Sequence, residues 1–185
     1  MLIIDPPSSS FDLTGVSKSG LVRFLNRACT AVKLVGTVHV LLTSDAEIKR
    51  LNKAFRGKNK TTDVLSFPAA NEAEGIAGDL AISLETALRQ AAEQGHGLRE
   101  ELRILLLHGL LHLAGEDHEA DTGTMAAREL HLRGELRLPA GLIERTEAPR
   151  TEAKRAKAAR AAAAPPMARG LTVKRVRRNL VGPER

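Results

Sequence analysis

The sequence predicts one domain that contains both helices and strands, followed by a basic tail. Short β-branched or apolar runs bounded by turn residues alternate with longer segments in which apolar residues recur at helical spacing. A chain of 185 residues is long enough for one core-forming domain. Beyond Pro139 the composition changes to alanine and basic residues of low complexity. We therefore assign residues 1–140 to the domain and 141–185 to a disordered tail.

The first part of the domain is expected to start with a short strand at 2–4 and an amphipathic helix within 17–34. The core-facing residues of that helix would be Leu21, Phe24, Leu25, Ala28 and Val32. Residues 37–43 predict a buried strand, and Ser44 with Glu47 fits a capping box that opens a helix through about Phe55. A polar loop over 56–63 leads to two further strands, 64–68 and 78–84.

The second part of the domain is expected to be helical, with a helix from Leu84 to Gly95, one over 98–114 and an amphipathic one over 125–138. The helix over 98–114 is apolar on almost every side beyond Arg103. Such a helix is buried in the domain centre, so its two histidines need an internal reason to be there.

Composition and charge restrict the location and the partners of the protein. A single cysteine, no basic leader and no apolar run of roughly 20 residues indicate a cytoplasmic protein without a membrane segment. Residues 145–185 contain 12 Lys/Arg and 3 Asp/Glu, a net charge of +9, which leaves 16 basic and 19 acidic residues elsewhere. Attraction to a polyanion is therefore expected mainly in the tail. With four Phe and no Tyr or Trp, the chain has little material for base stacking.

Three histidines in "HGLLHLAGEDH" (108–118) have the spacing of a metal site. His108 and His112 are four residues apart on one helix face, and Gly115 can end the helix in a left-handed conformation that lets His118 return to that face. Three imidazoles suit one zinc ion, with a fourth position left for water whose pKa would fall to about 7. The other three histidines, His39, His96 and His131, are expected to be structural, His39 as a core side chain on its strand.

The same histidine spacing occurs in zinc proteases, but this sequence fits that class of enzyme less well. Gly109 stands where such an enzyme carries its catalytic glutamate, so the proton shuttle for amide hydrolysis is missing.

The basic loop that precedes the histidines could bind a phosphate group. Arg56, Lys58 and Lys60 follow a helix end, which by itself is typical of a solvated surface. Beside a metal, the planar fork of Arg56 could instead hold a phosphodiester.

The segments "LNKAFRGKNKTTDVLSFP", "AGDLAIS" and "HGLLHLAGEDH", in this order, resemble the signatures of the YbeY family of bacterial rRNA-maturation endoribonucleases. The resemblance implies an α/β fold with a small mixed sheet packed by helices, and one zinc ion per chain on His108, His112 and His118 at the end of a buried central helix. It implies Arg56 and His108 as catalytic residues and a single-strand-specific endoribonuclease of 16S rRNA 3′-end maturation and ribosome quality control. The implied partners are single-stranded rRNA, the small ribosomal subunit and its assembly factors.

Two features depart from the family pattern. Glu116 replaces an aromatic residue and adds negative charge near the expected phosphate, and the tail has no counterpart in the signature segments. The tail charge suggests a tether to RNA or the ribosome, with a solvated tail of no fixed role as the alternative. Asp117, and less so Glu116, could orient a ligand imidazole.

A non-enzymatic ribosome-assembly factor with a structural zinc is an alternative that the sequence leaves open. A side chain of Asp117 on the metal would favour that structural role, whereas an open coordination position would favour catalysis.

Overall fold

A computed structural model describes residues 2–4, 13–70, 75–116 and 123–139, all of which lie in the first of two compact units of the chain, residues 1–148. The tail expected over 141–185, together with Asp117 and His118, lies outside the described residues. Within the described parts of the chain, no helix is long and apolar enough to cross a membrane.

A four-stranded mixed sheet forms the middle of the fold, in the order β1-β2-β4-β3. The strands are β1 (Leu2–Ile4), β2 (Thr37–Thr43), β3 (Val64–Pro68) and β4 (Ile76–Ser83). β1 and β4 both pair with β2 in parallel, whereas β3 runs antiparallel to β4 and forms an edge. The expected mixed sheet is confirmed, and β4 begins two residues earlier than the sequence predicts.

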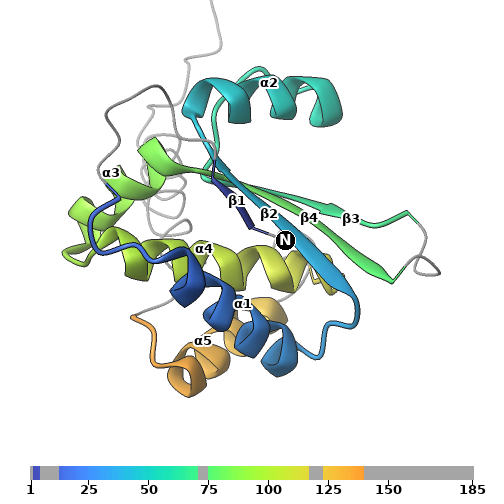
Figure 1. Cartoon of the computed structure of the whole chain (residues 1–185). Helices are drawn as coiled ribbons and strands as arrows, with labels where there is room; N and C mark the ends of the chain where they lie inside the picture. Colours follow the sequence, from blue (N-terminus) through green and yellow to red (C-terminus); the bar gives the residue numbers. More distant parts are fainter. Residues whose placement is uncertain (1, 5–12, 71–74, 117–122, 140–185) are drawn as a thin grey trace, which may run out of the picture. The chain divides into compact units, whose positions relative to one another are not determined.

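Within the described residues, five helices accompany this sheet: α1 (Lys18–Val32), α2 (Asp45–Arg56), α3 (Leu84–Gln94), α4 (Leu98–Leu113) and α5 (Thr124–Leu136). Figure 1 shows α2 alone on one face of the sheet, with α4, α1 and α5 on the other. The larger core lies on the α4 side, and the five apolar residues predicted for α1 are all buried in it. A smaller core under α2 contains Ile48, Leu65 and Ala81.

The helix ends follow from local chemistry. Ser44 accepts a hydrogen bond from the backbone N–H of Glu47 at 3.1 Å and so satisfies a donor at the start of α2. The carboxylate of Glu47 binds Arg50, so the structure contains the serine half of the predicted capping box. Gly57, Gly95 and Gly115 each adopt a positive φ where a helix ends, as expected for residues without a Cβ.

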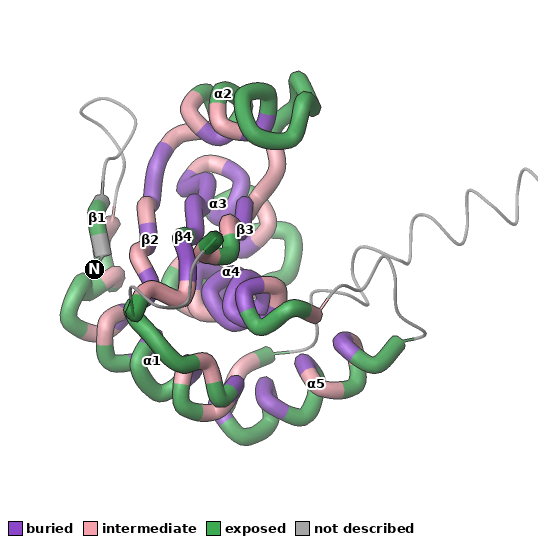
Figure 2. The backbone as a smooth tube through the Cα atoms, turned by 90° about the vertical axis from the view of Figure 1, so that its right-hand side faces the viewer, coloured by how far each residue is buried: buried purple, intermediate pink, exposed green. Residues whose placement is uncertain are grey.

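α4 is the central helix, as its composition predicts. Its apolar residues from Leu102 to Leu111 are all at most 1% exposed. Figure 2 shows α4 almost entirely buried, between the sheet and the helices α1 and α5. The burial of each such side chain contributes about 1.5–3 kcal/mol to folding, so the two histidines of α4 are held on a rigid element.

The structure corrects the expectation that His39 is a core residue. Its side chain is 39% exposed, and Nδ1 lies 3.1 Å from a carboxylate oxygen of Asp79, its register partner on β4. α2 covers the part of this sheet face around Leu41 and Leu65, so His39, two residues before Leu41 on β2, remains at the margin. His39 is therefore hydrogen-bonded to its neighbour strand but not buried.

Candidate functional site

The two histidines of α4 face each other as the helical spacing predicts. Nε2 of His108 and Nε2 of His112 are 3.1 Å apart, and the rings meet at an interplanar angle of 80°. Two ligands placed 2.0–2.1 Å from a tetrahedral zinc ion are separated by roughly 3.3 Å. The observed separation therefore fits two imidazoles that share one metal ion.

A carboxylate from another helix determines which nitrogen of His108 is free to bind a metal ion between His108 and His112. Glu129 of α5 lies 2.9 Å from Nδ1 of His108, and the side chain of Glu129 is 1% exposed. An ionised carboxylate only accepts hydrogen bonds, so Nδ1 carries the proton and donates it. In the neutral ring, Nε2 then presents a lone pair toward His112, which is the tautomer that a metal requires.

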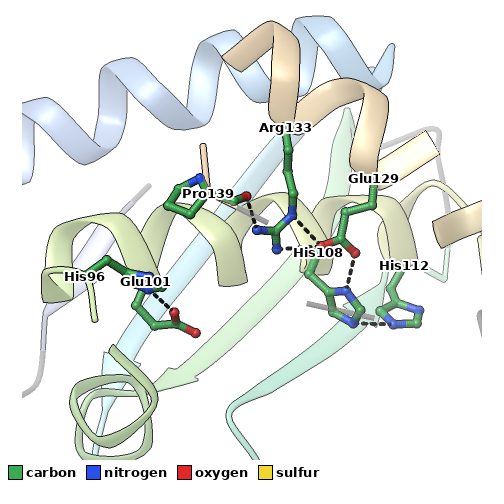
Figure 3. Close-up of polar contacts among 7 residues, drawn as sticks. All are labelled: His96, Glu101, His108, His112, Glu129, Arg133 and Pro139. Atoms are coloured by element: carbon green, nitrogen blue, oxygen red, sulfur yellow. Dashed lines mark hydrogen bonds and ion pairs between the residues drawn. The ribbon is translucent and has the colours of Figure 1, made fainter. Parts of the chain in front are cut away.

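Glu129 is itself held by a buried arginine. Arg133, one turn later on α5 and 1% exposed, donates from Nε at 2.8 Å and from Nη2 at 2.6 Å to the second carboxylate oxygen. Its Nη1 donates to the backbone carbonyl of Pro139 at 2.9 Å. Figure 3 shows these contacts as a continuous row from Pro139 through Arg133, Glu129 and His108 to His112.

Sequence reasoning missed Glu129 and Arg133, although the chain contains a signal for them. The buried positions of α5 are Met125, Glu129, Leu132, Arg133 and Leu136, which form one helical stripe. A glutamate and an arginine four residues apart on an otherwise apolar stripe indicate a buried ion pair with a specific task, because unpaired charges there would be too costly.

Arg56 reaches the histidine helix indirectly, through the edge strand. Its Nη2 donates to the backbone carbonyl of Ser66 on β3 at 3.1 Å. The hydroxyl of Ser66 donates to the carbonyl of Gly109, the residue after His108, at 3.4 Å. No ion pair joins Arg56 to a carboxylate within residues 2–4, 13–70, 75–116 and 123–139. The structure thus links Arg56 to the strand beside α4, but without a described contact to a histidine.

Gly109 has a packing role that the sequence does not reveal. A Cβ at this position would lie 2.8 Å from Cδ2 of Leu80 and 3.4 Å from Oγ of Ser66. The glycine therefore lets α4 approach the sheet closely. A glutamate here would be forced against Leu80 and Ser66 of the sheet, which disfavours the zinc-protease alternative on steric grounds.

The negative charge of Glu116 is largely neutralised. Its carboxylate pairs with Arg128 of α5, whose Nη2 also donates to the backbone carbonyl of Val32 at 2.7 Å. Glu116 therefore ties the end of α4 to α5 and α1, and the carboxylate that orients a histidine of the candidate site is Glu129. The other candidate, Asp117, lies outside the described residues, as does His118.

Asp63 and His96 have structural tasks. One oxygen of Asp63 accepts from Thr62 and from the backbone N–H of Val64, and the other accepts from Gln90 at 3.0 Å. His96 donates to the fully buried carboxylate of Glu101 at 2.5 Å, so it has a structural role at the start of α4. No group of three or more metal-ligating side chains occurs within the described parts of the chain.

This chain is similar in sequence to known proteins. Residues 14–136 match the model of the family described as endoribonuclease YbeY. A Koribacter versatilis protein named endoribonuclease YbeY is 56% identical over 137 residues, covering 74% of this chain and 89% of the relative. One of the same name from Solibacter usitatus is 48% identical over 131 residues, 71% of this chain and 87% of the relative. A Thermotoga maritima solution structure is 30% identical, with coverage of 74% of this chain and 92% of that one and a TM-score of 0.43.

Proposed function

Because this chain belongs to the YbeY endoribonuclease family, we propose that His108, His112 and His118 hold its metal ion and that Arg56 binds the scissile RNA phosphate. The activity of the family is hydrolysis within RNA chains, known for 16S rRNA maturation, and it depends on a metal. The assignment of residues to this chemistry is our proposal.

The observation that carries the proposal is the row from Arg133 to His112. A buried carboxylate fixes the tautomer of His108, and the nitrogen thereby directed at His112 lies 3.1 Å from its counterpart. This donor set fits zinc, for which the carboxylate–histidine arrangement is typical. A bound zinc ion would supply a Lewis acid that polarises a phosphoryl oxygen or lowers the pKa of water.

Arg56 suits the phosphate because its guanidinium remains available for it. One of its five N–H groups donates to Ser66, which orients the planar fork, and the residue as a whole is exposed. A guanidinium held in this way would stabilise the negative charge that develops on the phosphoryl oxygens during cleavage. With Glu116 paired to Arg128, little repulsion opposes an incoming phosphate.

The proposed substrate is single-stranded rRNA of the small ribosomal subunit, and the proposed partners are that subunit and its assembly factors in the cytoplasm. We assign catalysis to residues 1–140 and propose that residues 141–185 tether the enzyme to RNA. The tail holds most of the excess positive charge of the chain, and each neutralised phosphate releases counterions that favour binding.

The test compares cleavage of a labelled single-stranded RNA that carries the 16S 3′ end, alone and within small-subunit particles. The proteins are the wild type, Arg56→Ala and His112→Ala at matched folding, and zinc content is measured for each. We expect both variants to lose cleavage, with zinc retained in Arg56→Ala and lost in His112→Ala. Equal residual cleavage in all three would indicate a contaminating nuclease and contradict the proposed site.

A further inference from the structure

An exposed aromatic pair lies beside Arg56. The ring of Phe55, the penultimate residue of α2, meets the ring of Phe67 on β3 edge to face, with centroids 5.2 Å apart. Phe55 is nevertheless 68% exposed. The chain has four phenylalanines and neither tyrosine nor tryptophan, so this pair contains half of its large aromatic rings.

The pair and Arg56 are held by the same two elements. Phe55 precedes Arg56 on α2, and Phe67 follows Ser66 on β3. The hydrogen bond from Arg56 to Ser66 and the contact between the rings of Phe55 and Phe67 thus join adjacent residues of α2 to adjacent residues of β3. The guanidinium of Arg56 and the ring of Phe55 are therefore anchored to adjacent residues of the same strand.

The segment that carries Phe55 is strongly basic, and the nearest described carboxylate on the sheet is Asp79, the register partner of Phe67, which binds His39. From residue 53 to residue 62 the chain carries Lys53, Arg56, Lys58 and Lys60 and no acidic residue, and all four basic side chains are exposed. The backbone of this loop is pinned, since Asn52, which is 2% exposed, donates to the carbonyl of Lys60 at 2.8 Å. The loop that carries these charges therefore has a backbone anchored to α2, the helix of Phe55, and a basic segment with an exposed ring suits a ligand with anionic and aromatic parts.

We propose that Phe55, braced by Phe67, is a stacking platform for a nucleobase of single-stranded RNA next to the phosphate that Arg56 binds. The inference rests on the proposed function and deepens it by naming how the substrate strand is held. Any base can stack on the face of an aromatic ring, but it must be unpaired and turned out of its strand to do so. The platform would therefore select for single strands, and it would give the chain one stacking surface although its aromatic residues are few.

The experiment uses Phe55→Trp, because the chain has no tryptophan and the new indole is the only one in the protein. Full-length protein is titrated with a labelled single-stranded RNA, and binding is followed by anisotropy of the label and by tryptophan fluorescence. The RNA is checked for integrity on a gel after each titration. Leu88→Trp, at a 47% exposed position of α3, is the matched control.

The platform predicts that single-stranded RNA quenches the fluorescence of the indole at position 55 over the same concentrations at which the anisotropy of the label rises. An RNA duplex should not quench this indole, and the fluorescence of Leu88→Trp should not change with either RNA. The platform also predicts that Phe55→Leu, which keeps an apolar contact to Phe67, weakens single-strand binding about fivefold or more at unchanged thermal stability. Full binding with no quenching at position 55, or undiminished affinity of Phe55→Leu, would overturn the platform alone. If the wild type binds no RNA at all, the proposed function falls with it.

Discussion

Glu129 accepts a hydrogen bond from Nδ1 of His108 at 2.9 Å, although the two residues are 21 positions apart on different helices. This contact makes the tautomer of an α4 histidine depend on a carboxylate of α5. The candidate metal site is therefore supported by the last helix of the domain as well as by the helix that carries the histidines.

Replacement of Glu129 by glutamine should weaken metal binding about 10–100-fold, since an amide can donate to His108 and favour the wrong tautomer. Zinc affinity can be measured by competition with a coloured chelator, independently of RNA cleavage. Stability should also fall, by roughly 3–5 kcal/mol, because Arg133 loses its buried counter-charge.

Glu135→Gln, on the exposed face of the same helix, is the matched control and should change neither zinc affinity nor stability. Unchanged zinc affinity in Glu129→Gln, combined with reduced stability, would show that the ion pair serves only the fold.

Introduction of a glutamate at position 109 should destabilise the domain by about 3 kcal/mol or more, because a charge would be forced between α4 and Leu80. Urea denaturation followed by circular dichroism measures the loss. Gly134→Glu, at an exposed position of α5 where a Cβ meets nothing within 4 Å, should stay within about 0.5 kcal/mol of the wild type. A stable Gly109→Glu protein with peptidase activity would contradict the steric argument.

The thiol of Cys29 should react slowly with iodoacetamide. Burial raises the pKa of this thiol above its usual value, and a backbone hydrogen bond offsets a smaller part of that rise. The thiolate is the reactive form, so half-maximal alkylation should require a higher pH in the folded protein than in the urea-unfolded chain. Because the folded pKa is the higher one, the associated stability is present below the unfolded pKa and is lost as pH rises through the folded pKa. Equal pH profiles of alkylation in the two states would contradict the shift.

Removal of residues 141–185 should lower RNA affinity and reduce the salt dependence of binding, because a net charge of +9 over residues 145–185 is lost with them. The slope of the logarithm of the binding constant against the logarithm of salt concentration, measured by anisotropy with single-stranded RNA, should become less steep by about 0.7 for each phosphate contact removed. Cleavage of a short RNA at saturating concentration should persist, since the proposed site lies within residues 1–140. An unchanged slope would exclude the tail as a tether.

Much of this protein follows from local sequence. The nine elements of the described residues lie within about two residues of where periodicity and turn residues predict them, because hydrophobic spacing and helix caps depend on neighbours within a few positions. The adjacency of His108 and His112 is local in the same sense, since four residues make one helical turn. The left-handed Gly115, which ends α4, also follows from its residue type.

The tertiary structure alone decided three further matters. Glu129 contacts His108, Arg56 contacts Ser66, and the hydrogen of Gly109 faces Leu80, all across sequence separations that no local period encodes. The exposure of His39 could not be predicted from local sequence either, because it depends on how far α2 extends over the sheet. A chain specifies its helices and strands through short-range preferences, whereas the chemistry of a site depends on which of them pack together and in what register.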